Sequence, residues 1–270
     1  MPIAPSARVH PTAVIAPEAD VGEGVEVGPH VVLEGAVRVG EGCVLRPGCC
    51  LIGPLSLGRH NTVYGGAVLG ERPQHVHYKG EPTRLEIGDH NIIREHVTVH
   101  RGTTQSWVTR VGSHNFLMAH CHVAHDCRVG DHCILANGAL LAGHCTLEDN
   151  VYMSGNSAIH QWVRVGRLAL LSGVSASTKD IPPFIIQHRT NVVVGVNVVG
   201  MRRAGVPAAH IDAVRRAFHV LYREELALPN ALAKIEAEVG AVPEVAEMVA
   251  FIRAASGGRG INLGQDRDAA

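Results

Sequence analysis

The chain has 270 residues, which is enough for one large domain and one small domain. Apolar residues make up 46% of it but aromatic residues only 4%, so the core must be built from aliphatic and small side chains. The 24 Lys and Arg residues are balanced by 25 Asp and Glu residues, and this near-neutral charge gives no indication of a nucleic-acid partner or a membrane surface.

Nothing in the sequence indicates insertion into a membrane or export. The apolar stretch at 191–201 is shorter than the roughly 20 residues that span a bilayer, and the N-terminus lacks a secretory pattern. We therefore expect a cytoplasmic protein with no stable membrane insertion. The seven Cys residues include no CxxC pair, so in a reducing compartment we expect free thiols.

An internal repeat of six residues dominates the sequence from Val9 to Leu171. Every sixth position in this range gives 28 positions, of which 25 are aliphatic or Met, and the exceptions are His75, Glu81 and Gln105. Neither an amphipathic helix nor an alternating strand has this period. The repeat predicts a mainly β fold, a parallel β-helix in which three hexads form one coil of about 18 residues.

A second inward position lies two residues before each aliphatic one and is mostly small. Six of the seven Cys residues occupy it: Cys43, Cys49, Cys121, Cys127, Cys133 and Cys145. Because a free Cys often behaves as a small core residue, we interpret these six as core side chains rather than as metal or redox groups.

The aliphatic repeat is interrupted twice and resumes each time in the same phase. This predicts two loops, near 71–84 and 102–109, on a β-helix that spans 1–190. Loops that leave a rigid scaffold are candidate functional elements.

The pattern becomes helical after residue 206. Apolar residues at helical spacing predict three helices in a C-terminal domain at 191–264: Ile211, Val214, Phe218, Leu221 and Tyr222 in the first, Leu232, Ile235 and Val239 in the second, and Val245, Met248, Val249 and Ile252 in the third. We expect residues 265–270 to form a disordered tail.

Residues 18 apart should stack on the same face of successive coils. This rule predicts three columns: His125, Gly143 and Gln161; Asp126, His144 and Trp162; and His96, His114 and His132. The first two bring together an imidazole that can accept a hydroxyl proton, a carboxylate that can fix its tautomer, and a Gly N–H that can stabilise an oxyanion. The opposing interpretation is that most of the 18 His residues are exposed turn residues without a catalytic role.

Several segments closely resemble the UDP-N-acetylglucosamine acyltransferase family of lipid A biosynthesis: EPTRLEIGDHNIIREHVTVHRGT (81–103), VAHDCRVGDHCILANGALLAGH (123–144), IHQWVRVG (159–166), IPPF (181–184) and GVNVVGMRRAG (195–205). The resemblance covers nearly the whole chain, and the two long segments are specific to the family. It implies that the β-helix is left-handed, that the enzyme needs no metal or other cofactor, and that it forms a homotrimer with sites between subunits.

The family transfers an (R)-3-hydroxyacyl chain from acyl carrier protein to the 3-hydroxyl group of UDP-N-acetylglucosamine, the first step of lipid A biosynthesis. By resemblance, His125 is the general base and Asp126 is its orienting partner. The Gly143 N–H would hold the oxyanion that forms from the thioester.

The resemblance also implies substrate contacts. His122 and His144 would line the sugar and pantetheine region, and His160 and Gln161 would lie near the nucleotide. Gly173 would set the acyl chain length, because a Gly there leaves the acyl groove open for longer chains.

Two further residues, Asn197 and Arg203, would contact the UDP group. The acyl carrier protein that donates the chain is acidic, so exposed Arg residues are candidates for its docking surface. The candidates are Arg164, Arg167, Arg202, Arg203, Arg215 and Arg216.

This chain departs from the family pattern near the substrate. At 73–78, His75 stands where the family has Asp and His77 where it has Lys, both linked to substrate contacts. Val199 and Ala204 replace an acidic residue and an Arg that are frequent near the nucleotide. The acceptor could therefore be a 3-amino analogue of the sugar nucleotide, which would yield an amide.

Other functions remain open from the sequence. His120 and His125 have the spacing of zinc ligands in the γ-type carbonic anhydrases, with His96 or His144 as a third ligand. The altered loop would also fit a catalytically inactive scaffold. The N-acyltransferase of the same pathway is a third alternative, but it normally carries an extra N-terminal domain.

Overall fold

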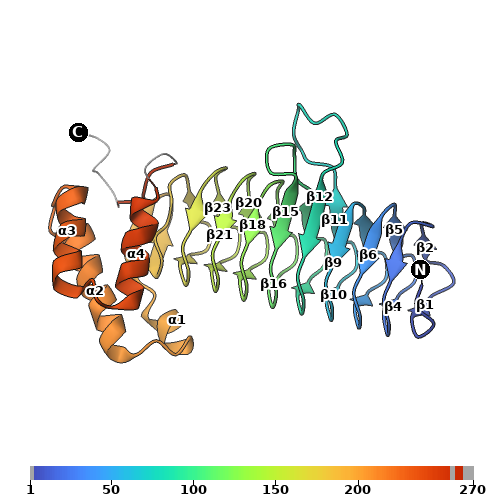
Figure 1. Cartoon of the computed structure of the whole chain (residues 1–270), viewed down its shortest axis with the longest axis horizontal. Helices are drawn as coiled ribbons and strands as arrows, with labels where there is room; N and C mark the ends of the chain where they lie inside the picture. Colours follow the sequence, from blue (N-terminus) through green and yellow to red (C-terminus); the bar gives the residue numbers. More distant parts are fainter. Residues whose placement is uncertain (1–2, 256–258, 264–270) are drawn as a thin grey trace.

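The computed structural model describes residues 3–255 and 259–263. Short parallel strands stack into a long prism, and a group of helices covers its C-terminal end (Figure 1). Successive strands belong to three different sheets, so that every third strand pairs with its neighbour in the stack. The expected fold class, a mainly β parallel β-helix followed by a small helical part, is confirmed.

The first sheet has eleven strands and runs the length of the prism. Its strands are β1 (Arg8–Val9), β4 (Glu26–Val27), β7 (Val44–Leu45), β10 (Thr62–Val63), β13 (Ile92–Ile93), β16 (Phe116–Leu117), β19 (Ile134–Leu135), β22 (Tyr152–Met153), β25 (Leu170–Leu171), β27 (Ile185–His188) and β28 (Val192–Val196). All pair in parallel except β27 and β28, which are antiparallel.

The second sheet has nine strands and the third has eight. The second contains β2 (Val14–Ile15), β5 (Val32–Glu34), β8 (Cys50–Ile52), β11 (Val68–Glu71), β14 (Thr98–His100), β17 (His122–Val123), β20 (Leu140–Leu141), β23 (Ala158–Ile159) and β26 (Ala176–Ser177). The third contains β3 (Asp20–Val21), β6 (Val37–Val39), β9 (Leu55–Leu57), β12 (Arg84–Ile87), β15 (Val108–Val111), β18 (Arg128–Val129), β21 (Thr146–Leu147) and β24 (Arg164–Val165).

The repeated aliphatic residues fill the prism, as their period predicts. Leu33, Leu51 and Leu69 of successive coils are at most 1% exposed. Val9 is in phase but 36% exposed, because the first coil has no complete coil beneath it. The six Cys residues at the second inward position are buried as free thiols, whereas Cys50 faces outward.

A ladder of buried Asn side chains, which the repeat pattern does not reveal, occupies the second inward position of three coils. Asn91 donates from its Nδ2 to Asn61 Oδ1 over 2.9 Å and to Gly112 O over 3.0 Å. Its Oδ1 accepts the Asn115 N–H over 2.9 Å. These bonds satisfy polar groups inside the prism that would otherwise be costly to bury.

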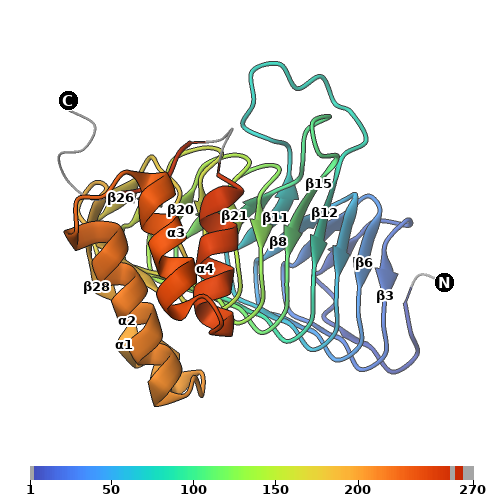
Figure 2. The ribbon, with the colours of Figure 1, turned by 60° about the vertical axis from the view of Figure 1, so that its left-hand side comes forward.

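Both interruptions of the repeat are loops that leave the prism between the second and third sheets (Figures 1 and 2). One joins β11 to β12, and Val63 therefore pairs with Ile93 of the next coil. The other joins β14 to β15, and Ile93 pairs with Leu117. The two coils that carry loops are thus longer than 18 residues.

These longer coils overturn one predicted column. His96 stacks on His120, with ring centroids 5.0 Å apart, and not on His114. His114 stacks on His90 and His132, at 5.0 and 4.8 Å. The prediction of a His96, His114 and His132 column was wrong because a constant step of 18 residues ignores the six inserted by the second loop.

Four helices follow the last strand: α1 (Val198–Arg203), α2 (Ala208–Arg223), α3 (Leu228–Val239) and α4 (Pro243–Arg253). The last three bury the apolar faces predicted for them, and α1 has no counterpart in the prediction. Within the described part of the chain, no helix is long and apolar enough to cross a membrane. The tail predicted at 265–270 lies outside the described residues.

Candidate active site

The turn between β17 and β18 carries the predicted base and its carboxylate partner. His125 and Asp126 are only 8% and 6% exposed, whereas the equivalent residues of the next turn, Asp131 and His132, are exposed. Burial therefore separates this pair from the repeated turn residues around it. Asp126 has a φ of 61°, a left-handed conformation that short polar residues tolerate.

The Asp126 carboxylate is held by residues of the second loop. Thr103 donates from its backbone N to Oδ1 over 2.9 Å and from its hydroxyl group to Oδ2 over 2.7 Å, and the Ser106 hydroxyl also donates to Oδ1. Burial opposes ionisation, but the hydrogen bonds from His125, Ser106 and Thr103 outweigh it and hold the pKa of Asp126 well below its usual range. The carboxylate is therefore ionised at neutral pH.

The tautomer of His125 follows from this ionised partner. His125 Nδ1 lies 2.8 Å from Asp126 Oδ2, and an ionised carboxylate can only accept, so the proton must be on Nδ1. Nε2 then carries a free lone pair. This is the arrangement that a general base requires.

Gly143, one coil further along, faces this imidazole. A Cβ atom at this position would lie 2.8 Å from His125 Nε2 and 2.6 Å from its Cε1, so any other residue would crowd the base. In the described part of the chain, no acceptor bonds to the Gly143 N–H. The predicted stacking of His125 beneath Gly143 is present, and an N–H donor is available beside the base.

More imidazole rings surround this pair. His144 stacks on Trp162 with ring centroids 3.8 Å apart, and its ring lies 5.1 Å from that of His125. Burial lowers the pKa of His144 below its ordinary value. From the first loop, the ring of His75 lies 5.2 Å from His125, and His77 lies 5.7 Å from His75. The first loop therefore folds over the site of its own chain.

His122 projects from β17 beside the site and has a partner that the sequence did not indicate. Its Nδ1 is 2.7 Å from Thr98 Oγ1, and its ring is 4.8 Å from that of His100. Burial lowers the pKa of His122 to about 4, so it is neutral at physiological pH. His100 is 5% exposed and its buried Nδ1 has no hydrogen-bond partner among the described residues. Its place directly after an inward Val, matching that of His160 after Ile159, was the available signal.

Two more predicted residues lie on the same edge of the prism. The Trp162 N–H donates to Gly143 O over 3.1 Å, which places Gln161 in the column of His125 and Gly143. His160 is exposed at the start of the same turn. The edge between the second and third sheets thus collects most of the predicted site.

The remaining predicted residues lie elsewhere on the chain. Gly173 is in a turn between the first and second sheets. Asn197 caps α1 at the third edge: its Oδ1 accepts the Gly200 N–H over 2.9 Å and its Nδ2 donates to Leu168 O over 2.8 Å. Both ends of this buried amide are occupied, so its observed role is structural and the geometry gives no support to a nucleotide contact. Arg203 is exposed on α1.

One cluster of three potential metal ligands is present in residues 3–255 and 259–263, and it consists of His125, Asp126 and His144. His120, a ligand in the zinc alternative, lies on another edge, where it stacks on His96.

Comparisons with known proteins agree with this geometry. The family model "Udp N-acetylglucosamine O-acyltransferase; Domain 2" matches residues 180–262, and the model "Bacterial transferase hexapeptide (six repeats)" matches residues 109–143. The two matches cover the helical end and the coils that carry His125 and Gly143.

Curated relatives and solved structures extend the likeness to the whole chain. The acyl-[acyl-carrier-protein]–UDP-N-acetylglucosamine O-acyltransferase of Halorhodospira halophila is 43% identical over 91% of this chain and 96% of its own length. That of an Anaeromyxobacter species is 44% identical over the same shares. The UDP-N-acetylglucosamine acyltransferase structure of Bacteroides fragilis is 39% identical with a TM-score of 0.86, covering 96% of this chain and 99% of that one. The chain therefore belongs to the family of acyl-[acyl-carrier-protein]–UDP-N-acetylglucosamine O-acyltransferases.

Proposed function

We propose that the enzyme transfers an (R)-3-hydroxyacyl chain from acyl carrier protein to the 3-hydroxyl group of UDP-N-acetylglucosamine, with His125 as general base. The observation that carries this proposal is the lone pair of His125 Nε2 beside the Gly143 amide. Nε2 takes the hydroxyl proton while the sugar oxygen attacks the thioester carbonyl carbon. The Gly143 N–H donates to the oxyanion. The intermediate then expels the pantetheine thiolate, which receives the proton from His125.

The direct test is a mass-spectrometric assay of the purified enzyme with a 3-hydroxyacyl carrier protein and UDP-N-acetylglucosamine. We expect an ester of the sugar nucleotide and free carrier protein in equal amounts, without added metal and in the presence of a chelator. Absence of the ester would contradict the proposal, and a requirement for zinc would favour the alternative metal enzyme.

A 3-amino sugar nucleotide is a second candidate acceptor, and the first loop favours it. His75 lies against the catalytic imidazole, where the family pattern has an acidic residue. Competition between the two acceptors in one reaction would decide between them. We expect the amide to form faster if His75 and His77 select the amine, whereas equal or better use of the ordinary sugar would remove this idea.

Active sites at the boundary between subunits of a homotrimer would reunite the predicted residues. Gly173, Asn197 and Arg203 lie on edges of the chain that do not carry His125, so within one chain the acyl groove and the nucleotide contacts are separate from the base. A site completed by a neighbouring copy would explain this separation, and it would place the open Gly173 position along the acyl chain.

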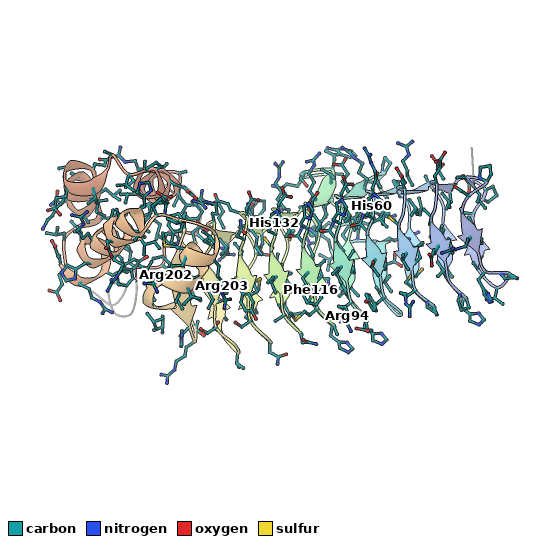
Figure 3. The ribbon with its side chains drawn as sticks, turned by 90° about the horizontal axis from the view of Figure 1, so that it is seen from below. His60, Arg94, Phe116, His132, Arg202 and Arg203 are labelled. Carbon is teal, nitrogen blue, oxygen red and sulfur yellow. The ribbon has the colours of Figure 1, made fainter. Side chains whose placement is uncertain are left out.

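The outer face of the first sheet supports such an assembly. Ile92, Phe116, Ile134, Tyr152 and Leu170 are in register along it, and Figure 3 labels Phe116 on this face. An apolar column on an open sheet face is typical of an interface. Light scattering should give a trimer for the wild-type chain and a smaller species for Phe116→Asp. A wild-type monomer would contradict the assembly.

The docking surface for the acidic carrier protein is smaller than the sequence suggested. Arg164 binds Asp180 at 2.8 Å and Arg167 binds Glu247 at 2.7 Å, so both serve to attach the helices. We propose that the exposed Arg202 and Arg203 of α1 (Figure 3) contribute to docking. Charge reversal at both should raise KM for the acyl carrier protein and leave KM for the sugar nucleotide unchanged. The cytoplasmic location stays a prediction.

A further inference from the structure

The second loop, between β14 and β15, is built to reach the turn that carries His125. Its neck is closed at Gly102, where a Cβ atom would lie 2.5 Å from Val108 N, so the two sides could not approach with a larger residue. Inside the loop, the Trp107 N–H donates to Thr103 O over 2.7 Å. This tight turn directs the hydroxyl groups of Thr103 and Ser106 toward Asp126.

The loop and His125 together occupy the whole acceptor capacity of Asp126. A carboxylate offers about four lone-pair sites. Oδ1 accepts the Thr103 N–H over 2.9 Å and the Ser106 hydroxyl, and Oδ2 accepts the Thr103 hydroxyl over 2.7 Å and the His125 Nδ1–H over 2.8 Å. The Asp126 N–H itself donates to Thr109 Oγ1 over 2.8 Å. No lone pair is left for His144, whose Nδ1 stays 3.7 Å from Oδ2.

We propose that Thr103 and Ser106 are positioning residues for the acyl transfer, because their hydroxyl groups lock Asp126 in the orientation in which His125 presents an unprotonated Nε2 beside Gly143. This inference rests on the proposed role of His125 as the base. It makes the inserted loop part of the catalytic apparatus and not merely a tolerated surface insertion.

The two hydroxyl groups have different consequences for the base. Thr103 shares Oδ2 with His125, so its hydroxyl group withdraws charge from the oxygen that stabilises the imidazolium form. Removing it makes Oδ2 a stronger acceptor and raises the proton affinity of His125. Ser106 bonds to the other oxygen and therefore acts mainly on the orientation of the carboxylate.

The experiment compares four variants of the full-length enzyme with matched changes. Thr103→Val removes the hydroxyl group while the shape and the backbone N–H remain, and Thr103→Ser restores the hydroxyl group. Ser106→Ala removes the second hydroxyl group. Thr104→Val is the control, because Thr104 is the exposed neighbour in the same loop. For each variant, kcat, KM for both substrates, the pH profile of kcat/KM and the melting temperature are measured.

For Thr103→Val we expect kcat to fall about 10- to 100-fold, KM to change less than about threefold, and the acidic limb of the pH profile to move to higher pH. Thr103→Ser should recover most of kcat, Ser106→Ala should lose a smaller part of it, and Thr104→Val should match the wild type. If Thr103→Val melts below the assay temperature, the kcat of Ser106→Ala decides.

The inference is overturned if the hydroxyl deletions keep wild-type kcat, if their loss appears only in KM, or if Thr103→Ser is as impaired as Thr103→Val. These outcomes are distinguishable from failure of the proposed function, which would show as retained turnover in His125→Ala.

Discussion

Two edges of the prism use the same turn in opposite ways. Between the third and first sheets, His60, His90, His114 and His132 stack at ring distances of 4.8–5.0 Å on the surface (Figure 3 labels the first and last). Between the second and third sheets, the equivalent position holds the buried Asp126, next to His125.

The difference between the two edges comes from the loops and not from the repeat. The first edge has no insertion, and its outer rings touch only one another, while an Asn ladder ties its coils together inside. The second edge carries both loops, which add Thr103, Ser106 and His75 around the turn. Regular stacking sets the spacing of rungs, and the insertions convert one rung into a candidate site.

The largest loss that sharpens this comparison is expected at Gly143. The Cβ atom of Gly143→Ala would press on His125 Nε2, where a contact of 2.8 Å cannot be accommodated without moving the base. We expect kcat to fall about 100-fold or more while the melting temperature changes little, because the backbone at Gly143 is not in the left-handed region.

Gly155→Ala is the matched control for this change. Its Cβ atom would meet only Asn137 O at 3.5 Å, an ordinary contact. Turnover equal to the wild type is expected. If Gly143→Ala were as active as Gly155→Ala, the reacting groups would not meet at His125.

A change inside the first edge should affect stability without touching the base. Asn91→Ala leaves Asn61 Oδ1, Gly112 O and the Asn115 N–H without their partner in the buried ladder. Unfolding free energy should fall by about 1–3 kcal/mol, measured by denaturant titration, with kcat preserved. Asn137→Ala, in an exposed turn, should unfold like the wild type. Equal stability of the two variants would mean that the ladder contributes little.

The smallest expected effect is a pH dependence of stability from the second edge. Burial lowers the pKa of folded His122 to about 4 from an ordinary value of 6.5. Between these values the unfolded chain binds the proton and the folded chain does not, so stability must rise with pH across this window. His122→Gln should flatten the rise in melting temperature between pH 4 and 6.5. His132→Gln, on the exposed edge, should leave it unchanged, and an unaltered slope in His122→Gln would contradict the assignment.

The sequence predicted the fold and one column of the site because both follow from a fixed period. The six-residue repeat places His125 beneath Gly143 wherever coils are 18 residues long, as they are beyond the loops. It failed for His96 and His114, because a loop changes the length of a coil without changing the phase of its aliphatic residues.

The partners of Asp126 could not be predicted by the same arithmetic. Thr103 and Ser106 lie in an insertion, and how an insertion folds back depends on contacts such as that at Gly102 rather than on a period. His100 was missed for a related reason, since only the packing of neighbouring strands shows that its ring is buried.

The most direct test of the account is the turnover of His125→Ala beside that of His132→Ala in the mass-spectrometric acyl-transfer assay. Both changes remove an imidazole from a turn of adjoining hexads and leave the aliphatic core intact. Loss of a general base should lower kcat about 100- to 10,000-fold, while the surface variant should keep wild-type turnover. Comparable activity in the two variants would show that the buried imidazole is not the base.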